Sequence, residues 1–349
     1  MGKSPHVAFL ISAEPFYNTK LGSLQRISSD ELPILKNLSI KRLILEPGSI
    51  REPHWHANCN ELTYCLSGKV LVTQLDVGNE FMNFTITAGQ MFFVKTGALH
   101  HIENIGEETA ELIVAFRHEA PKDFSLSASF GAMSDAVLGN TYDAPSSAFR
   151  GITRNTSPKY IVQRKGNPTV PDTAELPNPH KFDVENAPNG PQVEIGSANM
   201  ARKDFWPILD NMSMYSLRIE EDGMREPHWH PFTAEMGYVH KGNARMSVMD
   251  PDGSVDTYTL KPGDVYFIPH AYPHQIEVIG DEEIHFLIFF DAPIPGDVGY
   301  RTSATALSRE VLAATFGVDE DQLPEFPFTV KDPLLVGRKN PVDPVKSKI

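Results

Sequence analysis

An internal repeat constrains this chain more than any other feature of its sequence. The tripeptide His54-Trp55-His56 recurs as His228-Trp229-His230, at an offset of 174 positions, the difference between 228 and 54. A duplicated domain is the simplest explanation of a fixed offset without gaps. The same offset relates Gly22 to Gly196, Asn37 to Asn211, Arg51 to Arg225, Glu61 to Glu235, Gly68 to Gly242, Gly89 to Gly263, His100 to His274, Asp123 to Asp297, and Val137-Leu138 to Val311-Leu312.

The length of the chain agrees with two domains, because 349 residues exceed what one hydrophobic core usually supports. The repeat places a first domain at 21–139 and a second at 195–318. Residues 1–20 are then an N-terminal extension, and 319–349 are a proline-rich tail. The connecting stretch 140–194 is rich in Pro, Asn and Ser and is too long for an ordinary loop. We expect it to wrap over the surface or to add strands to a neighbouring barrel.

Each copy reads as a series of short β-strands separated by turn signals, which is typical of an all-β sandwich or barrel. Turns are marked by pairs such as Ser67-Gly68 and Lys241-Gly242. Each copy ends in a short helix, and in the second copy Ser308 is the expected N-cap and Gly317 the expected stop. The expected strands are 39–45, 61–66, 69–75 and 90–94 in the first copy, and 215–219, 236–240, 244–249 and 265–268 in the second.

The net charge of −14 disfavours nucleic acid and anionic membrane surfaces as partners. It does not exclude a small anionic substrate, because a bound metal ion dominates its local field. No apolar run approaches the roughly 20 residues of a membrane-spanning helix, and we expect a cytoplasmic protein. Cys59 and Cys65 form no metal-binding pattern and are expected to be reduced thiols.

Four residues of the first copy have the types and spacing of a metal site. His54 and His56 are two positions apart, so on a strand their side chains point to the same face. Glu61 begins the next strand, and His100 follows the turn at Gly89. Three imidazoles and one carboxylate suit Mn, Fe, Zn, Ni or Cu. Four protein ligands leave open positions on an octahedral ion, which indicates a catalytic rather than a structural metal.

The repeat decides between packing and metal binding for these histidines. An isolated His-x-His pair is more often a packed or surface pair than a ligand pair. The complete set of four recurs, however, at the same offset. It also selects His100 over the adjacent His101, because the partner of His101 is Gln275. The second predicted metal site is formed by His228, His230, Glu235 and His274.

At these residues the sequence resembles the cupin superfamily. The first cupin motif is matched in full by the first copy, and the second motif is matched except that Lys95 replaces a proline. Within the superfamily, the segment Arg51–His56 and its copy at Arg225–His230 resemble the Arg-Glu-x-His-Trp-His segment of oxalate decarboxylase-like bicupins. The residues that match the two motifs are Gly48, His54, His56, Glu61 and Gly68 for the first, and Gly89, Gly97, His100 and Asn104 for the second.

The resemblance implies two tandem cupin barrels of the jelly-roll (double-stranded β-helix) type with short accessory helices. It also implies Mn²⁺ in both sites, a trimer or hexamer of identical chains, and a substrate-polarising arginine at Arg51, with Arg225 as a second candidate. Periodicity alone disfavours that role, because Arg51 lies three residues before His54 and a flat strand turns it to the opposite face. A bend near Pro53 could bring Arg51 inward.

The acids that this family uses for decarboxylation are replaced. Loss of CO₂ leaves a carbon that must be protonated, and this requires a general acid. The family carries it in a lid segment after the first barrel, where this chain has Leu126 within Phe124–Phe130. A further family glutamate corresponds to Ile288, whose counterpart is Val114, and both are expected in the barrel core. Glu119 lies nearby but is expected to be a solvated loop charge.

Three functions follow from these residues. The leading hypothesis is a metal-dependent enzyme that acts on oxalate or a related small carboxylate by oxidation or decarboxylation, with dioxygen as a candidate co-substrate. The absence of the lid acid at Leu126 argues against decarboxylation more than against oxidation. One alternative is a cupin dioxygenase or isomerase that acts on a larger substrate. The other is a bicupin that binds a metal or ligand without catalysis.

Overall fold

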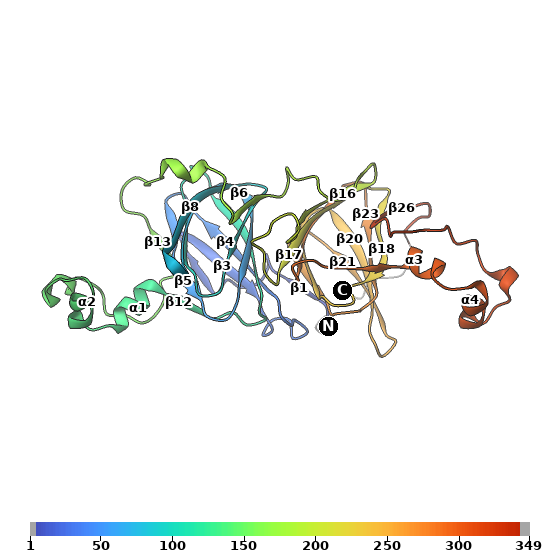
Figure 1. Cartoon of the computed structure of the whole chain (residues 1–349), viewed down its shortest axis with the longest axis horizontal. Helices are drawn as coiled ribbons and strands as arrows, with labels where there is room; N and C mark the ends of the chain where they lie inside the picture. Colours follow the sequence, from blue (N-terminus) through green and yellow to red (C-terminus); the bar gives the residue numbers. More distant parts are fainter. Residues whose placement is uncertain (1–4, 343–349) are drawn as a thin grey trace. The chain divides into compact units, whose positions relative to one another are not determined.

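The structure, a computed structural model, describes residues 5–342 and divides into two compact units (Figure 1). The first unit contains Leu10–Asn186 with Ile208–Asp210. Among the described residues, the second contains 5–9, Ala187–Pro207 and 211–342. Each unit has one seven-stranded and one six-stranded antiparallel sheet. The predicted all-β class with two tandem barrels is confirmed.

The first unit is built mainly from the first copy of the repeat. Its strands are β2 (Tyr17–Thr19), β3 (Gly22–Ile27), β4 (Ser39–Leu45), β5 (Ser49–His56), β6 (Glu61–Ser67), β7 (Lys69–Asp76), β8 (Glu80–Thr87), β9 (Gln90–Val94), β10 (Leu99–Asn104), β11 (Ala110–Phe116), β12 (Asp123–Ser125), β13 (Ile161–Gln163) and β14 (Lys181–Asp183). Its helices are η1 (Val77–Asn79), α1 (Leu126–Ala132), α2 (Asp135–Thr141), η2 (Ser146–Phe149) and η3 (Asp172–Glu175). One sheet has the order β14-β9-β6-β11-β4-β3-β2, and the other has β12-β5-β10-β7-β8 with β13 beside β5.

The second unit repeats this arrangement. Its strands are β1 (Val7–Phe9), β15 (Gln192–Val193), β16 (Gly196–Ala201), β17 (Ser213–Ile219), β18 (Gly223–Trp229), β19 (Glu235–Lys241), β20 (Asn243–Met249), β21 (Val255–Leu260), β22 (Asp264–Ile268), β23 (His274–Ile279), β24 (Ile284–Phe290), β25 (Val298–Gly299) and β26 (Leu335–Gly337). Its helices are α3 (Tyr300–Thr305), α4 (Arg309–Phe316) and η4 (Glu320–Gln322). One sheet has the order β1-β22-β19-β24-β17-β16-β15, and the other has β21-β20-β23-β18-β25 with β26 beside β18.

The connecting stretch and the tail both contribute a strand to the barrel that precedes them. In β13, Ile161 pairs with Arg51 of β5. In β26, Leu335 pairs with Arg225 of β18. The two strands differ by the offset of the repeat, which therefore extends well past the short helices. The expected boundaries at 139 and 318 exclude both strands.

The first strand of each copy lies in the barrel of the other copy. Strand β14, which precedes the second copy, pairs with β9 in the first unit, and β1 pairs with β22 in the second unit. The two pairings have equivalent registers, with Lys181 opposite Phe92 and Val7 opposite Tyr266. The chain before residue 20 thus supplies a sheet strand to the second unit. This reciprocal exchange requires both copies of the repeat for either barrel to be complete.

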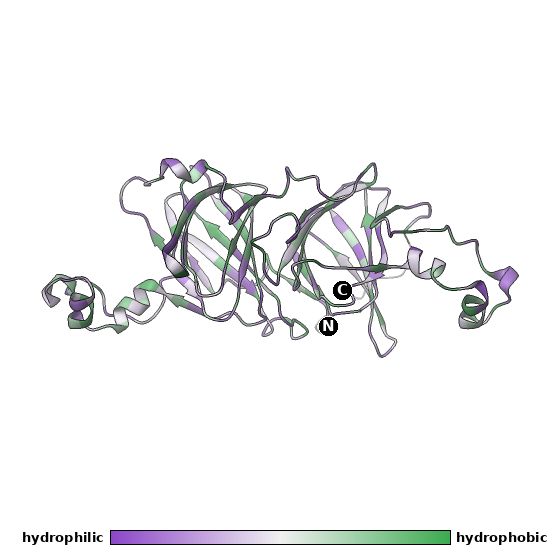
Figure 2. Ribbon diagram, viewed as in Figure 1, coloured by the Kyte–Doolittle hydropathy of each residue, from purple (hydrophilic) through white to green (hydrophobic). Residues whose placement is uncertain are grey.

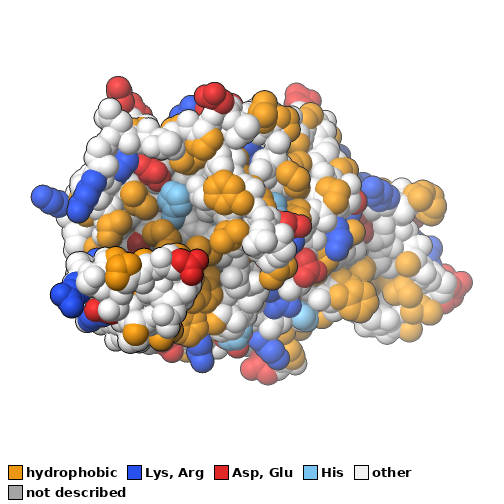
Figure 3. Space-filling view, turned by 60° about the vertical axis from the view of Figure 1, so that its left-hand side comes forward, with side chains coloured by type: hydrophobic (Ala, Val, Ile, Leu, Met, Phe, Trp, Pro, Cys, Tyr) orange, Lys and Arg blue, Asp and Glu red, His pale blue; other side chains and the backbone are white. Residues whose placement is uncertain are grey.

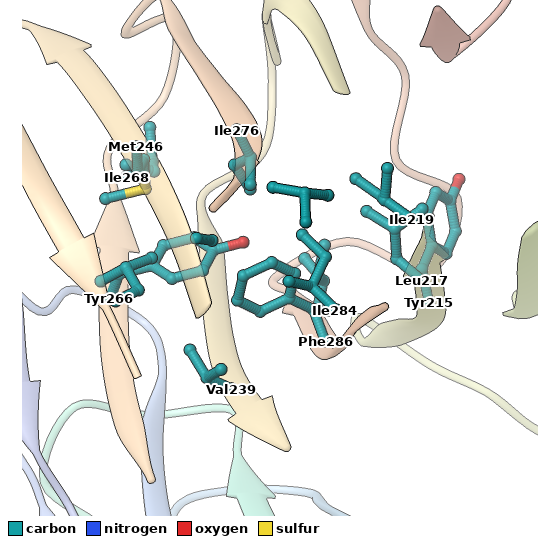
Figure 4. Packing of buried hydrophobic residues seen from close by; sticks show 14 of the residues in the cluster. Tyr215, Leu217, Ile219, Val239, Met246, Tyr266, Ile268, Ile276, Ile284 and Phe286 are labelled. Atoms are coloured by element: carbon teal, nitrogen blue, oxygen red, sulfur yellow. The ribbon is translucent and has the colours of Figure 1, made fainter. Parts of the chain in front are cut away.

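The barrel cores lie between the two sheets of each unit and are formed by inward-facing strand residues. Figure 2 shows hydrophobic residues concentrated on the strands. In the second barrel, Tyr266 and Phe286 pack edge to face, with ring centroids 5.9 Å apart and an interplanar angle of 85° (Figure 4). Such a geometry suits the quadrupoles of aromatic rings. The strands therefore provide a close-packed frame on which polar side chains are held in fixed positions.

The short helices follow the predicted signals. The side chain of Ser308 accepts a hydrogen bond from the backbone N–H of Val311, and Gly317 ends α4 with a φ of 68°. Ser134 caps α2 in the same way through Val137. Glycine takes this left-handed conformation without the strain that a Cβ atom would cause. Within residues 5–342, no helix is long and apolar enough to cross a membrane.

A buried histidine of the second barrel gives the fold a predictable response to acid. Burial lowers the pKa of His285 from 6.5 to about 2, so the folded protein keeps this ring neutral. Its Nε2 atom is hydrogen-bonded to the hydroxyl of Ser216 at 2.8 Å. Because the unfolded chain binds the proton first, stability is lost as the pH falls below 6.5.

We expect His285→Gln to make the free energy of unfolding less sensitive to acid. Between pH 7 and pH 5, the wild-type protein should lose about 2 kcal/mol more stability than the variant, because glutamine does not titrate. Urea denaturation at several pH values measures this difference. If the free energy of unfolding depends on pH equally in the two proteins, His285 is not held neutral.

Candidate metal centres

The two His-x-His segments lie on equivalent strands that contain the same irregularity. In β5, His54 lies opposite His100 of β10, but the register shifts before Arg51, which lies opposite Ile102. Two residues of β5 therefore face one residue of β10, which defines a β-bulge. The bulge turns Arg51 and His54 to the same side, and both are buried. It supplies the bend considered near Pro53, and β18 shows the same register shift against β23.

The structure brings together the four predicted ligands of the first barrel. The side chains of His54, His56, Glu61 and His100 are all buried, and one ligand atom from each lies within 4.8 Å of the others. The Nε2 atom of His56 is 2.7 Å from Oε2 of Glu61, and Nε2 of His100 is 3.4 Å from the same oxygen. Strands β5, β6 and β10 supply these residues. Three imidazole nitrogens and one carboxylate thus converge on one point.

Hydrogen bonds to the opposite ring nitrogens orient the three histidines. Nδ1 of His54 is 2.8 Å from the carbonyl oxygen of Glu52, and Nδ1 of His100 is 3.0 Å from that of Ala98. Nδ1 of His56 is 2.8 Å from the Asp123 carboxylate. Because these oxygens can only accept, each Nδ1 donates and each Nε2 keeps its lone pair for a metal. The donor set and its orientation therefore fit a divalent transition metal.

The second barrel contains the same arrangement. Nε2 of His230 is 2.8 Å from Oε2 of Glu235, and Nε2 of His274 is 3.4 Å from it. Nε2 of His228 is 3.2 Å from Nε2 of His230. All four side chains are buried and their ligand atoms lie within 4.8 Å of one another. The Nδ1 atoms all face backbone carbonyl oxygens, at 2.8 Å (Glu226), 3.0 Å (Gly296) and 2.9 Å (Tyr272), so that a carbonyl oxygen replaces the carboxylate that His56 contacts in the first barrel.

The electrostatics of both clusters keep the glutamate and the first histidine in metal-binding forms. Burial opposes ionisation of Glu61, but hydrogen bonds and charge from His100 and His56 hold its pKa well below 4.5. Burial, with the nearby charge of Arg51, lowers the pKa of His54 well below 6.5, so this ring is neutral. The glutamate and first histidine of the second barrel are shifted in the same directions. A carboxylate and a neutral imidazole are the forms that bind metals. For His56, burial lowers the pKa, but hydrogen bonds and charge from Asp123 and Glu61 outweigh it and raise the pKa above 6.5.

The two predicted arginines are buried beside the clusters and paired with aspartates of the repeat. Arg51 donates from Nη2 to Oδ2 of Asp123 at 3.2 Å and from Nη1 to the carbonyl oxygen of Tyr160 at 3.3 Å. Arg225 donates to Asp297 in the same way. Nη1 of Arg225 donates to the carbonyl oxygen of Leu334, the residue directly before β26, at 3.0 Å. Each guanidinium is thus held near the metal ligands by a carboxylate and by a strand from beyond the predicted domain.

The second glutamate oxygen receives a hydroxyl donor in both barrels, but from different residues. In the first barrel, Thr63 donates to Oε1 of Glu61 at 2.8 Å. In the second, Tyr266 donates to Oε1 of Glu235 at 2.6 Å. The position equivalent to Thr63 is Gly237, where a Cβ atom would lie 2.1 Å from the Tyr266 ring. This compensation leaves no signal in the sequence, because it involves two positions on neighbouring strands.

Leu126 stands at the start of α1, after its N-cap Ser125. It lines a cavity of about 470 Å³ together with Glu52, Ser127 and Phe130, among other residues. Figure 3 shows a hollow bordered by hydrophobic side chains on the forward face of the first barrel. The Glu52 carboxylate accepts hydrogen bonds from the Ser127 hydroxyl at 2.7 Å and from two backbone N–H groups of the connecting stretch. The described residues therefore place an apolar side chain where the family has its lid acid.

The residues at the position of the further family glutamate and at its counterpart lie in the barrel cores, as expected. Ile288 and Val114 are both buried in the hydrophobic cores of their barrels. The carboxylate of Glu119 accepts a hydrogen bond from the backbone N–H of Asn37 at 2.9 Å, and about a third of its side chain is exposed. Glu119 is held away from the ligands and does not replace the missing acid.

A lysine close to the first cluster was not singled out by the sequence. Lys41 lines a small inner cavity of about 20 Å³ together with Arg51, His54 and Glu61. Its Nζ atom lies 4.5 Å from the centroid of the Phe116 ring. Its position seven residues before the first cupin motif gave no signal. Only the closure of the barrel places β4 beside the metal ligands.

Comparisons with known proteins agree with this geometry. The cupin domain family matches residues 10–148 and 199–323. The oxalate decarboxylase OxdC of Bacillus subtilis (strain 168) is 29% identical over 324 residues, which cover 86% of this chain and 80% of that protein. A germin-like protein of Oryza sativa subsp. japonica is 30% identical over 136 residues, which cover 37% of this chain and 62% of that protein.

A solved structure shows the same likeness over the whole chain. The structure of an oxalate decarboxylase from Bacillus subtilis at pH 4.6 superposes with a TM-score of 0.84 and 25% identity. The match covers 97% of this chain and 89% of that one. The family match spans most of both repeats, and each repeat holds a three-histidine, one-glutamate cluster. The chain therefore belongs to the cupin family, as a bicupin related to oxalate decarboxylase with two metal-binding sites.

Proposed function

We propose that this bicupin is a Mn²⁺-dependent enzyme that acts on oxalate or a closely related small carboxylate, by oxidation more than by decarboxylation. The observation that carries the proposal is the buried arginine beside each metal cluster. Arg51 is held 3.2 Å from Asp123, with its guanidinium lining the same inner cavity as His54 and Glu61. An arginine fork is suited to holding a carboxylate in one orientation.

The size of the inner cavity favours a small substrate. Its volume of about 20 Å³ has room for about one water molecule. A two-carbon acid could enter by displacing that water and by exchanging the existing contacts of the arginine. A larger apolar substrate would have to displace core side chains such as Leu43 and Phe116, which are 2% exposed. The cavity therefore supports the oxalate class over the larger substrates of other cupin enzymes.

The metal would contribute chemistry that the side chains cannot. A bound Mn²⁺ would supply a Lewis-acidic centre with open positions for a carboxylate. The chain holds the ion through three neutral imidazoles and one carboxylate, with His56 fixed by Asp123. Arg51 would orient the second carboxylate of the substrate. The buried strands around both groups exclude bulk water and strengthen these interactions.

The missing lid acid supports oxidation. Oxidation of oxalate by dioxygen gives carbon dioxide and hydrogen peroxide and needs no proton on carbon. Decarboxylation gives carbon dioxide and formate, and its carbon must be protonated. Leu126 cannot donate a proton, and the Glu52 carboxylate nearby is occupied by the donors of Ser127 and the connecting stretch.

We expect the purified protein to bind two ions per chain, one for each cluster. Glu61→Gln should lower the occupancy to about one, because the only anionic ligand of the first cluster is lost. Glu119→Gln is the matched control and should retain both ions. Elemental analysis measures the occupancy, and electron paramagnetic resonance identifies Mn²⁺. Full occupancy in Glu61→Gln would contradict the assignment of this cluster.

We expect the Mn²⁺-loaded protein to consume oxalate and to release more hydrogen peroxide than formate. The measurement is a parallel assay of peroxide, formate and carbon dioxide between mild acid and neutral pH. Absence of turnover over that whole range would refute the oxalate proposal and favour a bicupin that only binds its ligands. Formate as the main product would refute the preference for oxidation.

Restoring an acid at the lid should shift the products. We expect Leu126→Glu to raise the ratio of formate to peroxide by about tenfold or more, because it supplies a general acid directly after Ser125, which pairs with His54. Leu126→Gln has a similar size and polarity without the proton and should leave the ratio nearly unchanged. Equal ratios in the two variants would show that this position does not control the outcome.

A further inference from the structure

Lys41 carries a positive charge into the first barrel beside the metal cluster. It belongs to β4, and its Nζ atom lies 3.0 Å from Oδ2 of Asp123. Arg51 reaches the same oxygen at 3.2 Å, while His56 contacts the other oxygen, Oδ1, at 2.8 Å. The lysine side chain is only 12% exposed. Asp123 thus contacts two cations, Lys41 and Arg51, and the metal ligand His56.

The second barrel lacks this lysine. The position equivalent to Lys41 is Tyr215, whose ring lies 4.9 Å from that of Phe290. The tyrosine hydroxyl is approached by Arg202 at 3.4 Å. Nε and Nη2 of Arg202, however, donate to the Asp204 carboxylate at 3.0 and 2.8 Å, so the charge of this arginine is neutralised locally. The two barrels share their metal ligands but differ in the charge beside them.

This difference changes the anion that each site can neutralise. In the first barrel, the charges of Arg51 and Lys41 balance those of Glu61 and Asp123. In the second, Arg225 alone faces two carboxylates, so one negative charge remains. Glu52 and Glu226, which are buried at equivalent positions next to the two arginines, add the same charge to both sites and leave the comparison unchanged. With the same divalent ion in both, the first site can neutralise a dianion, and the second only a monoanion.

The position of Lys41 also connects the cluster with the surface. Lys41 lines the inner cavity, and Lys41 and Asp123 both line an outer cavity of about 290 Å³ that includes Tyr160 and the exposed Lys122. A carboxylate that enters from the outer cavity first meets the ion pair of Lys41 and Asp123. It can replace Oδ2 of Asp123 as the partner of the lysine, because both are carboxylate oxygens. Asp123 keeps its contact with His56 through the other oxygen.

We propose that Lys41 selects the dianion of a small dicarboxylic acid at the first metal site, and that the second site, with Tyr215 in its place, does not bind this dianion comparably. The inference deepens the proposed function and rests on it, because it names the form of the substrate and the barrel that takes it. Lys41 is a recognition residue that contacts the carboxylate distant from the metal. A purely structural lysine would only stabilise Asp123.

Calorimetric titration of the full-length protein with oxalate tests the proposal. The protein is loaded with Zn²⁺, which suits histidine and carboxylate ligands and has no redox chemistry, so binding is measured without turnover. We expect one oxalate per chain. Lys41→Met should weaken oxalate binding about 10- to 100-fold, and Lys41→Arg should retain it within about fivefold. Lys122→Met, which removes a lysine of the outer cavity, should change it by less than about threefold.

Formate separates recognition from a structural role. It carries one carboxylate and needs no second cation, so its affinity should fall much less than that of oxalate in Lys41→Met. Equal losses for formate and oxalate would overturn the proposal, as would two equivalent oxalate sites in the wild-type protein or unchanged binding in Lys41→Met. Should Lys41→Met fail to fold, Tyr215→Lys decides the question, because it should add a second oxalate site per chain, and unchanged stoichiometry would refute the proposal.

The binding experiment and the turnover assay test the recognition role of Lys41 and the proposed function separately. Oxalate binding that depends on Lys41, without turnover by the Mn²⁺-loaded protein, would refute the proposed function and leave the recognition role intact. Turnover together with lysine-independent binding would refute the recognition role alone. No oxalate binding by the wild-type Zn²⁺ protein would refute the dianion site itself.

Discussion

The β-bulge between Arg51 and His54 is the constraint on which both the metal cluster and the arginine depend. In a regular strand, residues three apart face opposite sides, so either the histidines or the arginine would leave the barrel interior. The backbone of the bulge also orients a metal ligand, because the carbonyl oxygen of Glu52 accepts a hydrogen bond from Nδ1 of His54 at 2.8 Å. The Glu52 carboxylate meanwhile accepts from the N–H groups of Lys159 and Tyr160, at 2.6 and 2.8 Å. The irregular dipeptide Glu52-Pro53 therefore orients His54, turns Arg51 inward and anchors β13.

That anchored strand makes the sites dependent on segments beyond the compact repeats. The carbonyl oxygen of Tyr160, directly before β13, accepts from Arg51, and Leu334 before β26 does the same for Arg225. Both residues have positive φ values, of 59° and 68°, which is uncommon for residues with a side chain. The same unusual backbone occurs twice at the offset of the repeat and serves the same contact.

The sequence predicted the parts of the molecule that are encoded locally. The ligands were found because two positions apart on a strand means one face, and because the repeat distinguished His100 from His101. The caps at Ser308 and Gly317 were likewise readable from adjacent residues. The exchange of β1 and β14 could not be read, because short strands carry little signal and their partners are set by tertiary pairing. The role of Lys41 was hidden for the same reason, since its neighbours Asp123 and Phe116 are distant in sequence.

The two barrels differ around identical ligands, and two of the differences contrast a contact that is preserved with a charge that is lost. The hydroxyl that reaches the metal-binding glutamate moves from Thr63 to Tyr266, but the hydrogen bond is preserved at 2.8 and 2.6 Å. That exchange conserves the chemistry of the ligand. The replacement of Lys41 by Tyr215 conserves no such contact, because the positive charge is lost and its aspartate is left to a single arginine. A change that a barrel compensates indicates a shared requirement, whereas an uncompensated change of charge at the cavity indicates that the two sites no longer bind the same anion.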